Sequence, residues 1–190
     1  MVIKKIIFKF LVILAIIILL AVGFTIYSKN ESLAPLSTAG QIGEKNMNQQ
    51  KIVREPAVAG AFYGADKSEI AEMINIFLRQ VPDQGIAGRP RILIVPHAGH
   101  VYSGQTAAYA FKLLENFGFT KAILIGPSHN YPVSGLALSS ATHWKTPLGL
   151  VELAEINHKL AKEDNFIIND KIHQDEHSLE VEIPFLQIVS

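Results

Sequence analysis

Two short apolar runs, separated by one helix-like stretch, constrain the fold of this chain most. Residues 91–95 read RILIV, and residues 121–126 read KAILIG. Short runs without polar alternation are typical of strands that are covered on both faces of a parallel sheet. Residues 105–116, between them, have the apolar spacing of a helix. The order strand, helix, strand predicts a right-handed βαβ unit.

Each run ends in a turn that carries histidine. PHAGH follows the first run and contains His97 and His100, and GPSHN follows the second and contains His129. Neighbouring parallel strands bring their carboxyl ends to one edge of a sheet, where open α/β folds bind ligands. Imidazole binds zinc, iron and copper. His97 and His129 therefore predict a metal or catalytic pair, although a single histidine after a strand is more often a surface or hydrogen-bonded residue.

The remaining pattern predicts a further alternation of helices and strands. Residues 66–80 begin with the spacing of a capping box and continue as an amphipathic helix. The other expected elements are strands at 136–140 and 166–168, a turn at WKTPLG, and an amphipathic segment at 151–163. Residues 178–189 are expected to form a helix or an extended segment, because Pro184 limits a helix. The fold class predicted for residues 52–190 is α/β, with a mostly parallel sheet flanked by helices.

The stretch HQDEHSLEVEIPF concentrates ionisable side chains near the end of the chain. It contains His173, Asp175, Glu176 and His177, followed by Glu180 and Glu182. Acidic residues favour the first turn of a helix, so the stretch is compatible with a purely structural role. It is equally compatible with a general acid–base histidine beside carboxylates. A carboxylate would raise the pKa of His177 and burial would lower it, and the sequence does not weigh the two effects.

The first fifty residues differ in composition from the rest. Lysines precede an uncharged run from Phe10 to Ser28, which is close to the roughly 20 residues that cross a bilayer as a helix. We expect residues 1–29 to be a transmembrane anchor, with a cleaved signal segment as the alternative. The positive-inside rule then places the N-terminus in the cytoplasm and the domain outside the cell membrane, or leaves the domain secreted after cleavage. Residues 30–51, rich in Ser, Gly, Gln and Asn, are expected to be a flexible linker.

Charge and cysteine content exclude some classes of function. The 190 residues have 17 basic and 17 acidic side chains, so a nucleic-acid partner has no electrostatic support. The chain has no cysteine, which excludes disulfide frameworks and all-cysteine zinc sites within it.

Five ordered stretches resemble one known family. They read PAVAGAFYG, IVPHAGHVYSG, ILIGPSHN, TPLG and DEHSLEVEIPFLQ, and span about Arg54 to Ser190. In this order they are similar to the Memo family, which occurs in prokaryotes as the B component of the AmmeMemoRadiSam set. Five motifs in one order are far more specific than a single short pattern. The resemblance implies a fold like that of the class III non-haem iron extradiol dioxygenases of the LigB type.

The resemblance also implies roles for individual residues. The two metal-binding histidines of the family carry over to His97 and His129, with Fe(II) expected and copper as the alternative. The histidine of the EHS motif carries over to His177, which in the dioxygenases would be the acid–base residue, with Asp175 close before it. The third ligand is a cysteine in Memo proteins and a glutamate in the dioxygenases. It is expected beyond Ser190, so the domain is expected to be partial.

Four more residues are expected around the metal, as supporting or substrate-binding groups. They are His100, Tyr102, Ser128 and Glu176. His100 departs from the family pattern, which usually has tyrosine at this position.

Three functions follow as hypotheses. The first is a metal-binding protein, and possible oxidoreductase, with His177 as base. The second is a non-catalytic module that binds a peptide or small molecule in the same pocket, where Tyr102, Tyr131 and Trp144 would supply aromatic contacts. The third is a hydrolase that uses Ser103 or Ser128, but no G-x-S-x-G pattern supports it.

Overall fold

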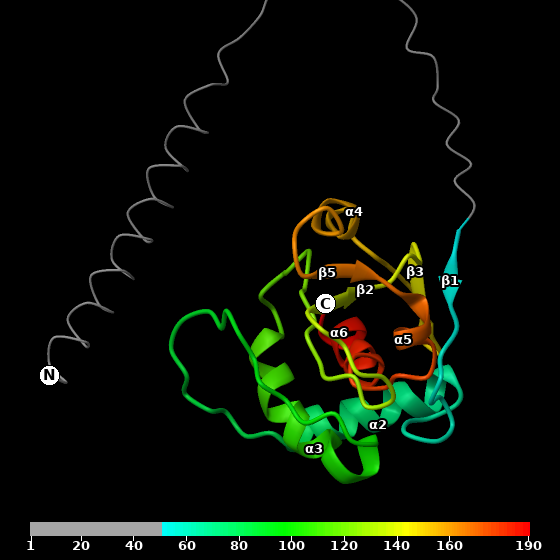
Figure 1. Ribbon diagram of the computed structural model, residues 1–190. Helices are drawn as coiled ribbons and strands as arrows, with labels where there is room; N and C mark the ends of the chain where they lie inside the picture. Colours follow the sequence, from blue (N-terminus) through cyan, green and yellow to red (C-terminus); the bar gives the residue numbers. More distant parts are fainter. Residues whose placement is uncertain (1–50) are drawn as a thin grey trace, which may run out of the picture. The chain divides into compact units, whose positions relative to one another are not determined.

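The computed structural model describes residues 51–190, which form a mixed α/β domain (Figure 1). In chain order the elements are β1 (Val53–Arg54), α2 (Lys67–Gln80), α3 (His100–Phe111), the 3-10 helix η1 (Lys112–Leu114), β2 (Leu136–Leu138), β3 (His143–Thr146), β4 (Gly149–Glu152), α4 (Ile156–Leu160), β5 (Phe166–Ile168), α5 (Asp170–Gln174), the 3-10 helix η2 (Glu180–Glu182) and α6 (Ile183–Val189). The predicted anchor and linker lie outside the described residues. Within residues 51–190, none of the helices has the length and apolar character to cross a bilayer.

Helices α2, α3 and α6 pack together around the main apolar core. Helix α2 begins at Asp66, whose side chain accepts a hydrogen bond from the Glu69 amide at 2.9 Å. The Glu69 carboxylate in turn accepts from the Ala65 amide at 3.2 Å. These reciprocal bonds confirm the predicted N-terminus of this helix. They satisfy the Glu69 amide, which the first turn leaves without a partner, and the Ala65 amide just before the helix.

Two small sheets take the place of the single, mostly parallel sheet that the sequence predicted. In the first, β1 pairs parallel to β3, and β3 pairs antiparallel to β4. In the second, β2 and β5 pair in parallel over three residues each. The strands predicted at 136–140 and 166–168 are therefore present. WKTPLG lies mostly in β3 and the hairpin turn after it, and the predicted helix at 151–163 is reduced to α4.

The two apolar runs with which the sequence analysis began are not paired strands. Residues 91–95 and 121–126 have no ladder partner among the described residues, so the predicted βαβ unit does not form. Helix α3 begins at His100, five residues before the predicted start at 105, and directly after the turn at residues 96–99 that follows the first run. One side of each run packs on a core, through Val95 and Leu124, while the isoleucines on the other side are exposed. Neither run has a strand beside it within residues 51–190, so the ladder that would define a strand does not form.

A buried ion pair joins the beginning of the domain to its end. Arg54 of β1 forms an ion pair with Glu180 of η2, whose side chain is 0 % exposed. The carboxylate of Glu180 also accepts hydrogen bonds from the Tyr63 hydroxyl at 2.5 Å and from the Ala57 and Val58 amides at 2.9 and 3.0 Å. A buried carboxylate with this many donors fixes the segments that supply them.

Arg54 also reaches the segment that carries the candidate site. Its guanidinium donates to the carbonyl of His173 at 2.8 Å and to that of Glu176 at 2.7 Å, and it stacks over the Trp144 ring at 4.5 Å. One side chain from the first strand thereby positions the backbone that precedes His177.

The buried carboxyl group of Glu182 should make the stability of the domain depend on pH in an unusual direction. Its side chain is buried in η2, its Oε2 has no hydrogen-bond partner among the described residues, and burial raises its pKa to about 8 from 4.5. The folded state binds this proton more tightly than the unfolded state. The protonated Glu182 therefore contributes its full stabilising effect below pH 4.5, and this contribution is lost as pH rises toward 8.

We expect the free energy of unfolding of the parent chain, relative to the Glu182→Gln variant, to fall by about 2–3 kcal/mol between pH 5 and pH 7. Glutamine keeps the shape of the protonated acid without its ionisation, so it is the matched control. Urea unfolding at both pH values measures the difference. Parallel pH profiles for the two proteins would contradict the expectation.

Candidate metal centre

The turn that carries His129 is held against the turn that carries His177. The Ser178 hydroxyl donates to the Pro127 carbonyl at 2.8 Å. A Cβ at Gly126 would lie 2.8 Å from the Ser178 hydroxyl oxygen and 2.9 Å from a methyl carbon of Leu179, so a side chain does not fit there. Glycine therefore allows the two turns to approach closely.

Glu176 links these two turns. Its carboxylate accepts hydrogen bonds from the amide of His129 at 2.6 Å, from the Nδ1 of the same residue at 2.9 Å, and from the amides of His177 and Ser178 at 2.8 Å each. Burial alone would raise the pKa of Glu176, but these hydrogen bonds outweigh burial and lower the pKa to about 2. The group is therefore an anion at physiological pH.

The bond to Glu176 also sets the chemistry of His129. A carboxylate only accepts, so Nδ1 of His129 carries the hydrogen and the neutral ring has its lone pair on Nε2. This is the arrangement in which a carboxylate orients a metal-binding histidine in many proteins.

Three imidazoles meet beside this carboxylate. The ring centroid of His129 lies 4.5 Å from that of His177 and 5.3 Å from that of His97, and the centroids of His97 and His177 are 6.1 Å apart. Candidate ligand atoms of His129, Glu176 and His177 all lie within 4.8 Å of one another. The structure thus brings together His97 and His129, although the sheet that was predicted to do so is not paired.

His177 is held in its neutral form by its surroundings. Burial is the main cause that lowers its pKa, and His129 and His97 lower it further, while the Glu176 carboxylate opposes them. The sequence did not show whether a neighbouring carboxylate or burial would dominate the pKa of His177, and in the structure burial dominates. A neutral imidazole can bind a metal ion or accept a proton. The Phe62 ring, 4.7 Å away between centroids, covers it.

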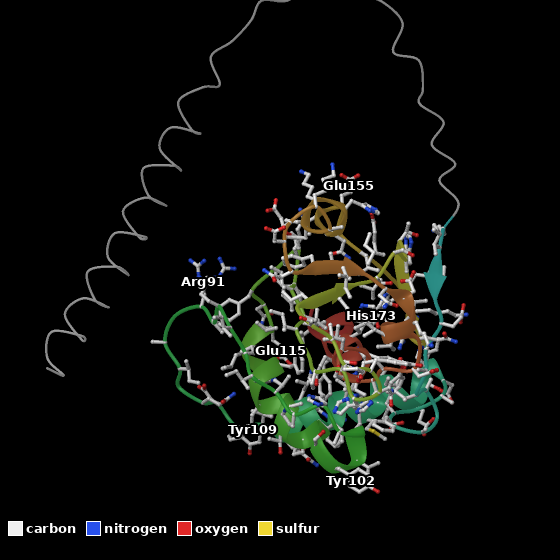
Figure 2. The ribbon with its side chains drawn as sticks, in the orientation of Figure 1. Arg91, Tyr102, Tyr109, Glu115, Glu155 and His173 are labelled. Carbon is white, nitrogen blue, oxygen red and sulfur yellow. The ribbon has the colours of Figure 1, made fainter. Side chains whose placement is uncertain are left out.

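Three other predicted site residues, His100, Tyr102 and Asp175, make their contacts outside this cluster. His100 is buried at 2 % exposure in the core, where its Nε2 donates to the Val181 carbonyl at 2.8 Å and its ring packs against Tyr63 and Phe185. Tyr102 is 88 % exposed and projects from the outer edge of α3 (Figure 2). Asp175 is exposed at the end of α5, and its carbonyl accepts from Asn130 at 3.0 Å.

The hydroxyl groups of the hydrolase hypothesis are engaged elsewhere. Ser103 donates to the Ala98 carbonyl at 3.1 Å, and Ser128 donates to the Tyr131 carbonyl at 2.7 Å. Neither makes a hydrogen bond to histidine within the described residues. Trp144, offered as a peptide contact, is buried against Arg54 and His173. These placements remove the support for a serine nucleophile and for a tryptophan contact.

Sequence reasoning missed the residues that support the centre from outside. Arg54 lies just before the PAVAGAFYG motif, and its sequence neighbours give no sign that it is buried. Glu180 did carry a signal, because it lies between Leu179 and Val181 in an apolar stretch, where an acid is buried only when it is paired. Phe62 gave no signal that separates it from an ordinary core residue.

The role of Glu176 leads to a prediction. In Glu176→Gln, the side-chain amide keeps the shape but loses the charge and one acceptor, so His129 is oriented less firmly. We expect Fe(II) affinity to fall about 10- to 100-fold, as it typically does when the outer partner of a metal-binding histidine is lost. Asp175→Asn, which removes an exposed neighbouring charge, is the matched control and should change affinity little. Equal effects in the two variants, measured by anaerobic titration, would contradict a positioning role.

Comparisons with known proteins show similarity to one family. The model of a family described as "Memo-like protein" matches residues 54–190. A MEMO1 family protein of Aquifex aeolicus is 40 % identical over 136 residues, which cover 71 % of this chain and 49 % of the relative. MEMO1 family proteins of Thermoplasma volcanium and Nitrosopumilus maritimus are each 38 % identical, over 72 % and 73 % of this chain and 51 % and 52 % of the relatives.

The chain spans about half the length of the curated relatives that it matches. The matched stretch contains both histidine turns and the Glu176–His177 segment, which form the cluster described above. On this match, the chain belongs to the Memo family.

Proposed function

We propose that the domain binds one redox-active metal ion at His97 and His129, with Fe(II) as the expected ion and copper as the alternative. The observation that carries the proposal is that the rings of His97, His129 and His177 lie together, with the Glu176 carboxylate orienting His129. Three neighbouring imidazoles bring several ring nitrogens into a small volume, and such a donor set suits divalent first-row metals.

The donor set fits such an ion. The carboxylate oxygens of Glu176 already accept hydrogen bonds from the His129 ring and from three backbone amides. In this proposal Glu176 therefore orients His129 and is not itself a metal ligand. His97 and His129 then supply nitrogen ligands from two different turns. Two protein ligands leave coordination positions for water or a substrate, as in catalytic rather than structural metal sites.

We further propose that the centre serves an oxidoreductase reaction on a small-molecule substrate. Bound iron would supply one-electron and dioxygen chemistry that amino-acid side chains lack. In this proposal His177 accepts a proton from the substrate, and its lowered pKa and its position beside His129 and Phe62 support that role.

Anaerobic titration tests the proposal. We expect about one equivalent of Fe(II) to bind, and competition with Cu(II) or Zn(II) to occupy the same site, because the three ions favour imidazole ligands. His177→Ala should leave one equivalent bound but abolish oxygen consumption with catechol-type substrates. Loss of metal in His177→Ala would instead make that residue a ligand. Metal binding without oxygen consumption in the parent chain would favour the binding-module hypothesis over the enzyme.

A further inference from the structure

His100 is a buried histidine that lies outside the proposed metal centre. Its ring packs between Tyr63, at 5.5 Å, and Phe185, at 5.0 Å between centroids. Its Nε2 atom lies 2.8 Å from the carbonyl oxygen of Val181. A carbonyl oxygen only accepts, so Nε2 carries the hydrogen and donates it. Burial lowers the pKa of His100, which favours the neutral ring.

Two short routes connect His100 to His177. On one side, the Val181 carbonyl accepts from the His100 ring, and the Val181 amide donates to the His177 carbonyl at 3.1 Å. On the other side, the His100 amide donates to the Phe62 carbonyl at 2.7 Å, and the Phe62 ring lies 4.7 Å from the His177 ring between centroids. One residue, Val181 or Phe62, therefore stands between His100 and His177 on each route.

His100 also ends the turn that carries His97. Within residues 51–190, the turn at residues 96–100 makes two hydrogen bonds to segments other than α3, and both are made by His100. The rings of His97 and His177 are 6.1 Å apart between centroids. The amide and the ring of His100 therefore supply the hydrogen bonds that hold the His97 turn on the side of the cluster where His177 lies.

We infer that His100 is a positioning residue of the metal centre, which sets where His97 stands relative to His129 and His177. This role rests on the proposed metal site and gives it a second anchor. The Glu176 carboxylate holds the His129 ring directly. His100 holds His97 through the short stretch of backbone that joins them, and it contacts neither the metal ligands nor a substrate.

A role in core packing alone predicts a different response to substitution. If His100 only filled the core, an apolar side chain of similar length would replace it at a cost in stability and in nothing else. If it positions His97, the hydrogen bond to the Val181 carbonyl is the feature that matters, because a buried carbonyl that loses its partner is costly to leave in place. Glutamine and methionine have similar length, and only glutamine has an N–H donor.

Anaerobic Fe(II) titration of the full chain, held in lipid nanodiscs, compares His100→Gln with His100→Met. We expect His100→Gln to keep the parent affinity and His100→Met to bind about 10-fold more weakly, the low end of the loss seen when an outer partner of a metal-binding histidine is removed. His100→Leu is a second variant without the donor, so the comparison stands if His100→Met does not fold. Equal affinity in His100→Gln and in the apolar variants would overturn the positioning role.

Phe185→Leu is the matched control for core stability. It loosens the packing beside the His100 ring and leaves both hydrogen bonds of His100 in place. It should lower the free energy of unfolding, because it removes buried volume, and leave Fe(II) affinity unchanged at a temperature where the variant is folded. An affinity loss in Phe185→Leu as large as that in His100→Met would assign the effect to core stability and overturn the positioning role.

Hydrogen exchange of the metal-free chain separates this role from metal binding itself. The amides of His100, Tyr102 and Ser103 are hydrogen-bonded where α3 begins, so their exchange reports how firmly the His97 turn is held. We expect them to exchange at least about 10-fold faster in His100→Met than in His100→Gln. Equal rates in the two variants would overturn the positioning role. A parent chain that binds no Fe(II) but shows this difference would contradict the metal site and support His100 as the anchor of the His97 turn.

Discussion

Replacing His97 or His129 by alanine is expected to lower the Fe(II) affinity of this chain more than about 100-fold. Loss of an outer partner of a metal-binding histidine already costs 10- to 100-fold, and loss of the ligand itself costs more. Each residue supplies one of the nitrogens that the proposed centre needs, and each comes from a different turn. Neither substitution removes a residue of the main core, so the variants are expected to fold.

The measurement is anaerobic Fe(II) titration of the two variants beside the parent chain. His158→Ala is the matched control, because His158 is exposed on α4 and belongs to no candidate ligand group among the described residues. It should bind metal as the parent does. If neither His97→Ala nor His129→Ala changes the affinity, the metal centre does not lie where we propose.

Replacing Glu180 by alanine is expected to reduce the free energy of unfolding by about 3–5 kcal/mol. Removing one member of a buried ion pair leaves the other charge uncompensated in a low-dielectric interior. Here the remaining charge is the guanidinium of Arg54, and the Tyr63 hydroxyl and two amides lose their acceptor as well. The loss is large relative to the 5–15 kcal/mol that typically separates folded from unfolded states.

An exposed ion pair provides the control for this substitution. Lys145 and Glu55 are joined at 2.9 Å with side chains 49 % and 65 % exposed, so Glu55→Ala should change stability little. Urea unfolding, followed by circular dichroism, compares the two variants. The single tryptophan, Trp144, gives a second probe because Arg54 stacks on it. Equal effects of Glu180→Ala and Glu55→Ala would show that the buried network does not hold the fold.

Local signals in the sequence predicted the elements whose stability is local. The capping box at Asp66 and the apolar spacing behind it define α2 to within one residue. The short strands at 136–138 and 166–168 are present because their β-branched and apolar residues find each other in parallel register. The interactions that decide these structures lie within one segment, for α2, or between two strands, for β2 and β5.

The two apolar runs show where such reasoning ends. Their composition predicts strands, but a strand is completed by its neighbours, and periodicity does not reveal whether those neighbours are present. Residues 91–95 and 121–126 have one side packed, and they pair with no strand in the described chain.

The proximity of His97 and His129 was predictable from the sequence, and the residues that hold them in place were not. His97 and His129 stand at the ends of two apolar runs, which is a signal that spacing alone provides. The depression of the Glu176 pKa depends on amides of three residues brought together by folding, and no sequence pattern encodes it. His100 was misleading for the same reason, since a histidine in a turn gives no sign that helix α3 will begin there and bury it.

X-ray absorption at the iron edge of the Fe(II)-loaded chain tests the central claim most directly. We predict at least two imidazole nitrogens in the first coordination shell, with the outer-shell scattering that imidazole rings give. The His97→Ala and His129→Ala variants should each lose one of these nitrogens. A shell that contains only oxygen, or one that is unchanged in both variants, would contradict the assignment of this cluster as the metal centre.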